Sequence, residues 1–312
     1  MKIYMEVTTK MVIRKLTVCA LSLAVLGTVI LTPCEVMAVL DSSYAAAYLR
    51  TGIGARALGM GGAFRSIADD GSAIYWNPGG NAFIEKKEVN VSYSALSSDR
   101  GLNFLSYTHP MSIGTFAVGL INSGVSGIKG YTSAGVENGD VVVSNNAFFL
   151  SYARKVGDIV GVGANVKILA SQVQGNSGIG FGVDFGAVVQ PIKNLAVGLM
   201  MQDIASSISW NTASNAVDSV GMNLALCASY KLFDSVNVAA GINKYSDYKN
   251  IGYNVGLEYM SEVFGFRAGL ENNNPCAGFT VRIMNLVGLT YAYVSDPLNE
   301  GNSHIVTLDL RF

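Results

Sequence analysis

The chain has 312 residues, of which 50% are hydrophobic and 35 are glycine, but only 14% are charged and the net charge is −1. The balanced charge and the absence of a basic run argue against a nucleic-acid-binding protein. Beyond the first forty residues, no apolar run approaches the roughly 20 residues that a membrane helix needs. The apolar residues are therefore many but dispersed.

The N-terminal stretch has the features of a secretory signal peptide. Arg14 and Lys15 precede an almost uncharged apolar run at residues 16–31, and small residues spaced for cleavage end at Ala38. We expect residues 1–38 to be a cleaved signal peptide and the mature chain to be exported. The alternative reading is a membrane-anchor helix.

Translation could start at either of two methionines, Met1 or Met11, because the first ten residues add nothing to the signal pattern. Cleavage would remove two of the four cysteines and leave Cys227 and Cys276. Two cysteines without a C-x-x-C spacing form neither a disulfide framework nor a metal site. We expect both to be free thiols.

A glycine-rich stretch at residues 54–80 precedes the strand patterns. Residues 52–57 fit the G-x-G-x-x-G/A form, but that fingerprint needs a hydrophobic strand before it and a helix after it, and here only strand patterns follow. Asp69 and Asp70 are neighbours whose side chains tend to point apart, and the two histidines, His109 and His304, are distant in sequence. A solvated or turn-capping role for the acids is favoured over catalysis or metal binding, and no cofactor is expected.

From Glu85 onward, the sequence alternates with the two-residue period of β-strands. Residues 159–168 place valine, alanine and isoleucine on one face and glycine, asparagine and lysine on the other, and residues 221–230 repeat this pattern. The pattern predicts fourteen strands, at residues 87–96, 100–109, 113–122, 142–154, 159–171, 178–189, 193–203, 218–231, 235–243, 251–260, 263–271, 275–284, 286–295 and 303–312.

The connections between these strands alternate in length. The connections after even-numbered strands are tight, at residues 109–111, 155–158, 191–194, 232–235, 261–262 and 284–285. Those after odd-numbered strands are longer and more polar, at residues 123–141, 172–177, 202–217, 244–250 and 296–302. Outer-membrane barrels have short periplasmic turns and longer outside loops, whereas a soluble sandwich has no reason to alternate in this way. We therefore expect an all-β protein, a fourteen-stranded antiparallel transmembrane β-barrel.

The last strand predicts the cellular location. Residues 304–312 place Val306, Leu308, Leu310 and Phe312 on one face and end on an aromatic carboxyl terminus. A closing strand of this form resembles the signal that the outer-membrane barrel assembly machinery reads, with Phe312 as its last residue. We expect the bacterial outer membrane as the location, with lipid and this machinery as partners.

Two motifs, G-A-R-A-L-G-M-G-G-A-F and A-D-D-G-S-A-I-Y-W-N-P-G-G, stand between the signal peptide and the predicted barrel. Together they resemble the PorV/PorQ family, which is similar in turn to FadL-type long-chain fatty acid transporters. The resemblance covers residues 45–80 and extends as architecture to Phe312. It implies that residues 39–84 form a plug, or hatch, in the lumen of a barrel at 85–312.

The resemblance also implies a route for a ligand. In FadL-type proteins, an Asn-Pro-Ala motif in the hatch lies beside a kinked strand, where a gap in the wall lets a hydrophobic ligand leave sideways into the membrane. Asn77 and Pro78 match this motif, and Gly79 replaces its alanine.

The residue chemistry is compatible with a plug, although a purely structural plug would need the same residues. Glycines permit close backbone approach, Pro78 fixes a rigid turn, and the rings of Tyr75 and Trp76 fill space and offer polar tips. The glycines in question are Gly59, Gly61 and Gly62. The charged candidates of the plug are Arg65, Asp69 and Asp70, expected to pair with inward-facing Asp184, Lys167, Glu258, Arg267 and Arg282.

Three functions are compatible with the sequence. The first is passive transport of hydrophobic compounds such as long-chain fatty acids through the lumen and a lateral opening. The second is a PorV-like role in type IX secretion, with secretion-system proteins as partners, and the third is a structural or adhesive barrel. The modest loops favour transport. An outer-membrane enzyme is disfavoured, because its catalytic constellation would need a histidine near a serine or aspartate.

Overall fold

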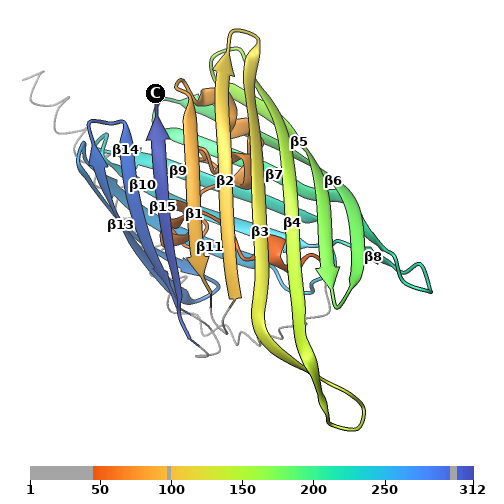
Figure 1. Cartoon of the computed structure of the whole chain (residues 1–312). Helices are drawn as coiled ribbons and strands as arrows, with labels where there is room; N and C mark the ends of the chain where they lie inside the picture. The colour runs from red at the N-terminus through yellow and green to blue at the C-terminus, as the bar shows by residue number, and fades with distance from the viewer. Residues whose placement is uncertain (1–44, 97–99, 296–300) are drawn as a thin grey trace, which may run out of the picture. The chain divides into compact units, whose positions relative to one another are not determined.

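The computed structural model describes residues 45–96, 100–295 and 301–312, so the expected signal peptide at 1–38 lies outside the described residues. Strands dominate (Figure 1). They are β1 (Glu88–Ala95), β2 (Arg100–Met111), β3 (Gly114–Tyr131), β4 (Glu137–Val156), β5 (Val160–Val173), β6 (Asn176–Ile192), β7 (Leu195–Trp210), β8 (Val217–Ser219), β9 (Asn223–Leu232), β10 (Val236–Tyr245), β11 (Gly252–Met260), β12 (Phe264–Glu271), β13 (Asn274–Ile283), β14 (Val287–Val294) and β15 (Ser303–Arg311).

The strands form a closed antiparallel barrel. Each long strand pairs with its neighbours in sequence, except that β7 pairs with β9 and the short β8 pairs only with β7. Pairing of β1 with β15 closes the ring, from Glu88 opposite Arg311 to Ala95 opposite His304. The predicted fourteen-stranded barrel is confirmed, and β8 is an addition outside the ring of fourteen.

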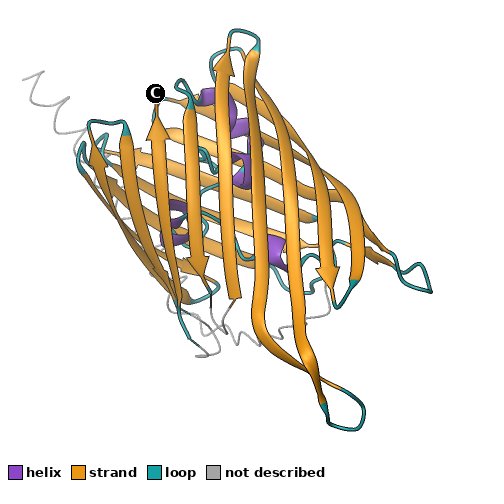
Figure 2. Ribbon diagram, viewed as in Figure 1, coloured by secondary structure: helices purple, strands orange, loops and turns teal. Residues whose placement is uncertain are grey.

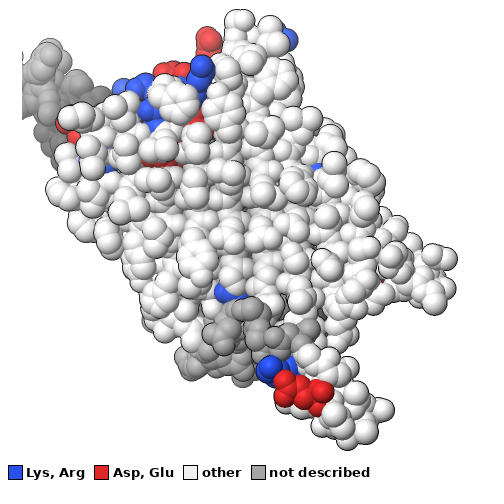
Figure 3. Space-filling view, in the orientation of Figure 1, with Lys and Arg blue, Asp and Glu red and all other residues white. Residues whose placement is uncertain are grey.

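The alternation seen in the sequence separates the outside of the barrel from its inside. In β9, Leu224, Leu226 and Tyr230 are exposed on the outer face, whereas Ala225 and Cys227 are buried on the inner face. Because successive side chains of a strand point to opposite faces, the same arrangement repeats around the ring. Figure 3 shows that, on the face in view, charged side chains gather toward the two ends and the broad middle is almost free of them.

The turns at one end of the barrel are as short as expected. Only two or three residues connect the strands there, at residues 112–113, 157–159, 193–194, 233–235, 261–263 and 284–286. We call this the turn end. The C-terminus lies at this end, where the backbone N–H groups of Phe312 and Lys87 each donate to the carbonyl of the other at 3.0 and 3.1 Å.

At the other end, several expected loops are wrong because they are largely strand. The expected loop at 123–141 is a hairpin in which β3 continues to Tyr131 and β4 begins at Glu137, and it projects beyond the rest of the barrel (Figure 1). The expected loop at 172–177 contracts to residues 174–175, and β7 continues to Trp210. Cross-strand pairing overrides the glycine-rich, polar composition that predicted loops.

No helix among the described residues is long and apolar enough to cross a membrane. The helices are short and precede the first strand: η1 (Ala47–Arg50), α2 (Ala55–Gly59), α3 (Ala73–Trp76) and η2 (Pro78–Phe83). Figure 2 shows them within the outline of the strands.

Candidate functional site: a buried N-terminal segment beside an irregular strand

The N-terminal segment, residues 45–84, packs against inward faces on different sides of the ring. Helix α2 contacts β12, β13, β14 and β15, whereas η2 contacts β3, β4, β5 and β6. Side chains of the strands donate hydrogen bonds to its backbone: Asn254 to Gly61 O at 2.6 Å, Gln202 to Tyr75 O at 2.9 Å and Asn165 to Ile74 O at 2.7 Å. The barrel wall therefore holds this segment by its main chain.

Glycines allow the segment and the strands to meet backbone to backbone. A Cβ on Gly61, which has a φ of +62°, would lie 2.6 Å from the carbonyl carbon of Leu270. Across the contact, a Cβ on Gly269 would lie 2.7 Å from Met60 O. Two of the other predicted plug glycines are less tightly enclosed: a Cβ on Gly59 would lie 3.4 Å from the Cα of Gly278, and one on Gly62 would lie 3.1 Å from the Asn254 amide nitrogen.

Asn77 joins the segment to two neighbouring strands of the wall. The side chain is fully buried, and its Nδ2 lies within donating distance of the carbonyls of Arg65, Ala187 and Leu199, at 2.8, 3.1 and 3.3 Å. Its Oδ1 accepts the Gly79 N–H at 3.0 Å. The amide thus links the turn at residues 77–79 with β6 and β7.

Pro78 and Gly79 lie directly on glycines of β5 and β6. A Cβ on Gly79 would be 2.8 Å from the Cα of Ala187 and from the carbonyl oxygens of Gly161 and Gly186. An alanine side chain at this position would therefore collide with the backbone of the wall.

The two aromatic side chains before Asn77 are buried and tied to the start of the segment. Trp76 Nε1 donates to Ile53 O at 2.9 Å, and the Tyr75 hydroxyl donates to Leu49 O at 2.7 Å. Their rings meet edge to face, with centroids 5.1 Å apart. Each polar tip is therefore satisfied inside the protein, as buried tryptophan and tyrosine require.

Arg56, which no sequence pattern indicated, is the main charged contact of the segment. It pairs with Glu258 of β11 at 2.8 Å and with Asp70 at 3.0 Å, and it also pairs with Asp69. Arg267 joins from β12, bonding Glu258 at 2.8 Å. Burial raises the pKa of Asp70, but the Arg56 guanidinium and the Ser72 hydrogen bonds outweigh it and hold that pKa below its ordinary value.

The expected pairing of Arg65 with an inward carboxylate is wrong. Its guanidinium lies over the Trp76 ring, 5.0 Å from the centroid, and it forms no ion pair with any described residue. Asp70 is buried, against the expectation of a solvated acid, whereas the Asp69 side chain remains 52% exposed. Arg56, the second residue of α2, instead pairs with both acids and with Glu258.

Strand β7 is irregular next to Asn77. Phe185 pairs with Met201 and Phe181 pairs with Ser207, so β7 carries two more residues than β6 over this interval. Asp203 and Ala205 have left-handed φ values of +58° and +51°. Such extra residues form β-bulges, which bend a strand and interrupt its ladder.

The other edge of β7 changes partner at the same place. Its ladder with β9 ends at the Gln202–Asn223 pair, and its ladder with β8 begins at the Ser207–Ser219 pair. Residues 203–206 of β7 therefore lie between the two ladders. In this interval, the Val220 N–H donates a hydrogen bond to Ser206 O at 2.9 Å. We call residues 201–207 the bulged section of β7.

A buried ionic cluster holds the bulged section against β5 and β6. Lys167 Nζ lies 2.6 Å from Asp184 Oδ1 and also pairs with Asp203. The Asp203 N–H donates to Asp184 at 2.8 Å, and Asn165 donates to the same carboxylate at 3.0 Å. The alternation of the strands placed Lys167 and Asp184 on inward faces, but nothing in the local sequence marked Asp203.

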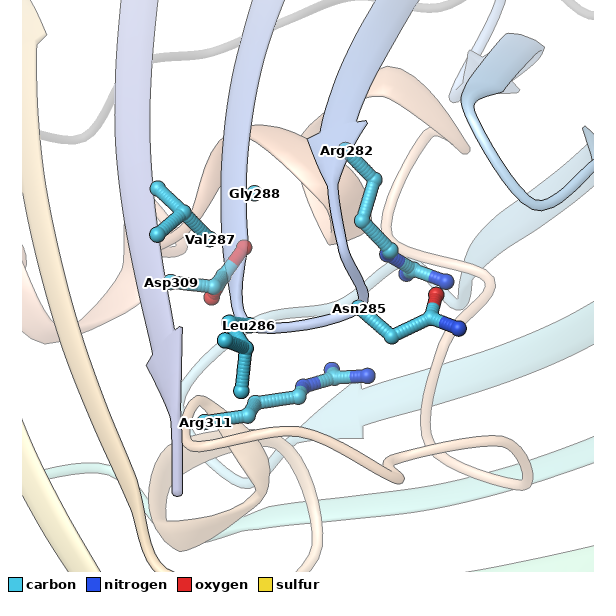
Figure 4. A pocket seen from close by; sticks show the side chains of 7 residues that line it. All are labelled: Arg282, Asn285, Leu286, Val287, Gly288, Asp309 and Arg311. Atoms are coloured by element: carbon cyan, nitrogen blue, oxygen red, sulfur yellow. The ribbon is translucent and has the colours of Figure 1, made fainter.

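A separate small hollow of about 10 Å³ lies at the turn between β13 and β14. Figure 4 shows Arg282, Asn285 and Arg311 reaching toward the same side of this turn. Arg282 forms no ion pair with a described residue, so its expected pairing with the segment is wrong. The hollow is lined from β13, β14 and β15, whereas Asn77 contacts β6 and β7.

No metal site is found in the described part of the chain, where no three histidine, cysteine or acidic side chains gather in a suitable group. Cys227 and Cys276 are buried free thiols, and Ser66 Oγ donates to the Cys227 sulfur at 3.3 Å.

The fold is similar to those of solved bacterial channels for hydrophobic compounds. The toluene transporter TbuX of Ralstonia pickettii matches with a TM-score of 0.63 at 13% identity, over 84% of this chain and 98% of that chain. The toluene transporter TodX of P. putida gives 0.62 at 12% identity, over 84% and 99%. A FadL homologue of Pseudomonas aeruginosa gives 0.58 at 13% identity, over 83% and 97%.

No protein-family profile and no curated protein matches the sequence. At identities this low, the structural likeness establishes the fold, a closed barrel like those of the FadL-type channels. It does not carry over residues or ligands.

Proposed function

We propose that this protein is an outer-membrane β-barrel that passively transports hydrophobic small molecules, such as long-chain fatty acids, through its lumen and a lateral opening. The observation that carries the proposal is the contact between Asn77 and the wall, where the buried amide reaches the carbonyls of Ala187 and Leu199 beside the bulged section of β7. A wall weakened at one place, with an internal segment attached next to it, suits sideways release.

In this mechanism the N-terminal segment acts as the plug. Its backbone contacts with the strands block a direct path along the lumen, so a ligand that enters from the end opposite the turn end is diverted toward β7. The lipid around the apolar outer face of the barrel then offers the ligand a favourable destination, since removing apolar surface from water is favourable by roughly 25 cal/mol per Å². Neither ATP nor a catalytic group is needed.

We also propose the route by which the protein reaches the membrane. The signal peptide at 1–38 would direct export, and the barrel assembly machinery would recognise the closing strand that ends at Phe312. The exposed apolar side chains of the strands would then contact outer-membrane lipid. Bulky apolar residues on an outward face are what a bilayer, rather than water, accommodates.

The test is binding and uptake with Asn77→Ala and Pro78→Ala beside the unaltered protein. Purified protein in detergent is titrated with oleate and with toluene, and uptake is measured in a strain that lacks its own fatty acid transporter. We expect saturable binding and restored uptake, with Asn77→Ala reducing uptake because it removes every contact between the amide and the wall. Gly101→Ala is the control, since a Cβ there meets nothing within 4 Å.

A properly folded barrel that neither binds these compounds nor restores uptake would overturn the transport proposal. Folding is checked in each preparation by the resistance of the barrel to unfolding in cold detergent. Reduced uptake by the Gly101→Ala control would show that the assay reports expression rather than transport.

One observation favours the second candidate, a PorV-like role in type IX secretion. The β3–β4 hairpin extends beyond the paired wall, since β3 meets β2 only up to Val125 and β4 meets β5 only up to Val143. An ordered projection of this kind would suit contact with secreted proteins. Replacing residues 127–141 with an Asn-Gly turn should leave transport intact, whereas it would abolish a function that depends on the projection.

A further inference from the structure

Arg65 differs from the other buried basic side chains of the described residues. Arg65, Lys167 and Arg267 are only 6%, 2% and 4% exposed. Lys167 and Arg267 each pair with a carboxylate, at 2.6 and 2.8 Å. Arg65 has no such partner: its Nε is buried without a hydrogen bond, and its Nη1 makes a single long bond of 3.5 Å to Gly62 O.

An unpaired guanidinium in the interior is costly. Removing an ion from water without a counter-charge costs several kcal/mol, and buried charges are normally paired and hydrogen-bonded. The stacking on Trp76 at 5.0 Å offsets part of this cost. Glu271 attracts Arg65 through space, but it forms no ion pair with any described residue. The Nε donor of Arg65 thus lacks an acceptor, which a ligand could provide.

The surroundings of Arg65 combine this positive charge with aromatic surface. Trp76 presents its ring face to the guanidinium, and the Tyr75 ring meets Trp76 edge to face. Tyr75 and Trp76 direct their polar atoms to backbone carbonyls elsewhere, and both rings are buried in the core beside Arg65, each side chain only 4% exposed. A cation beside aromatic faces matches a molecule with an anionic head and an apolar tail.

Arg65 is also connected to the wall. Its carbonyl accepts a hydrogen bond from Asn77 Nδ2 at 2.8 Å, and the same amide nitrogen reaches Ala187 and Leu199 beside the bulged section of β7. Asn77 alone would therefore separate Arg65, with its bound head group, from the strands at the proposed exit.

We propose that Arg65 is the anchor for the carboxylate of the transported compound, so that the substrates are anionic amphiphiles in preference to neutral hydrocarbons. The inference rests on the transport function proposed above. The Arg65 guanidinium donates from Nε to the carboxylate of the ligand. Charge-assisted hydrogen bonds of this kind are about twice as strong as neutral ones. Neutral hydrocarbons would lack this interaction.

The test compares oleate with oleyl alcohol, which has the same chain and a neutral head, at a pH where the acid is ionised. Binding to the full-length purified barrel is measured for the unaltered protein, Arg65→Gln and Arg65→Lys. We expect the unaltered protein to bind oleate about tenfold more tightly than the alcohol, the factor that a single charge-assisted hydrogen bond provides. Arg65→Gln should lose this preference while its affinity for the alcohol changes by less than about twofold.

Arg65→Lys keeps the charge but lacks the planar fork, so it should retain part of the preference. Arg282→Gln is the matched control, because it removes an arginine without an ion pair at the turn end, and it should bind like the unaltered protein. Equal binding of acid and alcohol by the unaltered protein would overturn the anchor while leaving hydrophobic transport standing. Failure to bind either compound would overturn both proposals.

Discussion

At the scale of single residues, Gly79 shows how closely the segment and the wall approach. A Cβ at this position would lie 2.8 Å from backbone atoms of Gly161, Gly186 and Ala187, none of which can move aside as a flexible side chain would. We expect Gly79→Ala to destabilise the protein by about 1–3 kcal/mol, the usual cost of overpacking. The measurement is equilibrium unfolding by urea after refolding into lipid vesicles.

The comparison for this residue is again Gly101→Ala, whose Cβ would have open space. It should change the free energy of unfolding by less than about 0.5 kcal/mol, as surface substitutions usually do. A Gly79→Ala protein as stable as this control would show that the turn at residues 77–79 can retreat from the wall. The substitution is informative because it recreates the Asn-Pro-Ala sequence of the FadL-type motif.

At the scale of one element, the bulged section of β7 depends on the ionic cluster around Lys167. Replacing Lys167 with methionine leaves the carboxylates of Asp184 and Asp203 buried without their counter-charge. Breaking one side of a buried ion pair typically costs about 3–5 kcal/mol. We expect Lys167→Met to lower the free energy of unfolding by this amount, measured by the same urea titration.

The matched variant removes the whole cluster, combining Lys167→Met with Asp184→Asn and Asp203→Asn. Because no uncompensated charge remains, its loss of stability should be much smaller than that of Lys167→Met alone. Equal losses in the two proteins would mean that Lys167 supports β7 through packing, not charge. Reduced uptake by the triple variant despite normal stability would connect the bulged section to transport.

At the scale of the whole molecule, the apolar outer face predicts how the barrel responds to charge. Val166 is exposed on the outer face near the middle of β5. We expect Val166→Arg to destabilise the lipid-embedded barrel by about 2–4 kcal/mol, as arginine does near the bilayer midplane. Met284→Arg, at an 85% exposed turn position, should have almost no effect. Equal responses at the two sites in lipid vesicles would contradict a membrane-spanning barrel.

Much of this architecture could be predicted from side-chain alternation. The residues of β9 separate into an exposed apolar row and a buried row as the pattern indicated, because a strand exposes successive residues to opposite faces. The long hairpin could not be predicted, since residues 123–141 are rich in glycine and polar side chains. Pairs such as Ile128 with Val141 form between residues that no local pattern connects.

The candidate site was predictable in part. The family resemblance implied that Trp76, Asn77 and Pro78 belong to an internal plug, and all three are buried in the structure. The choice between Arg56 and Arg65 as the partner of the acids could not be made, because both are arginines in the same glycine-rich stretch. Likewise, the left-handed backbone at Asp203 follows from the mismatch between β6 and β7, to which residues far apart contribute.

The linear order of apolar and small residues was thus sufficient for the number of strands, their antiparallel connection and the closed barrel. These features follow from a two-residue period and short turns, which are local properties of the chain. The position of the bulged section, the identity of the paired arginine and the isolation of Arg65 arise only on folding. They depend on which side chains from distant strands meet in the interior, where a charge without a partner is costly and a methyl group without space cannot be accommodated.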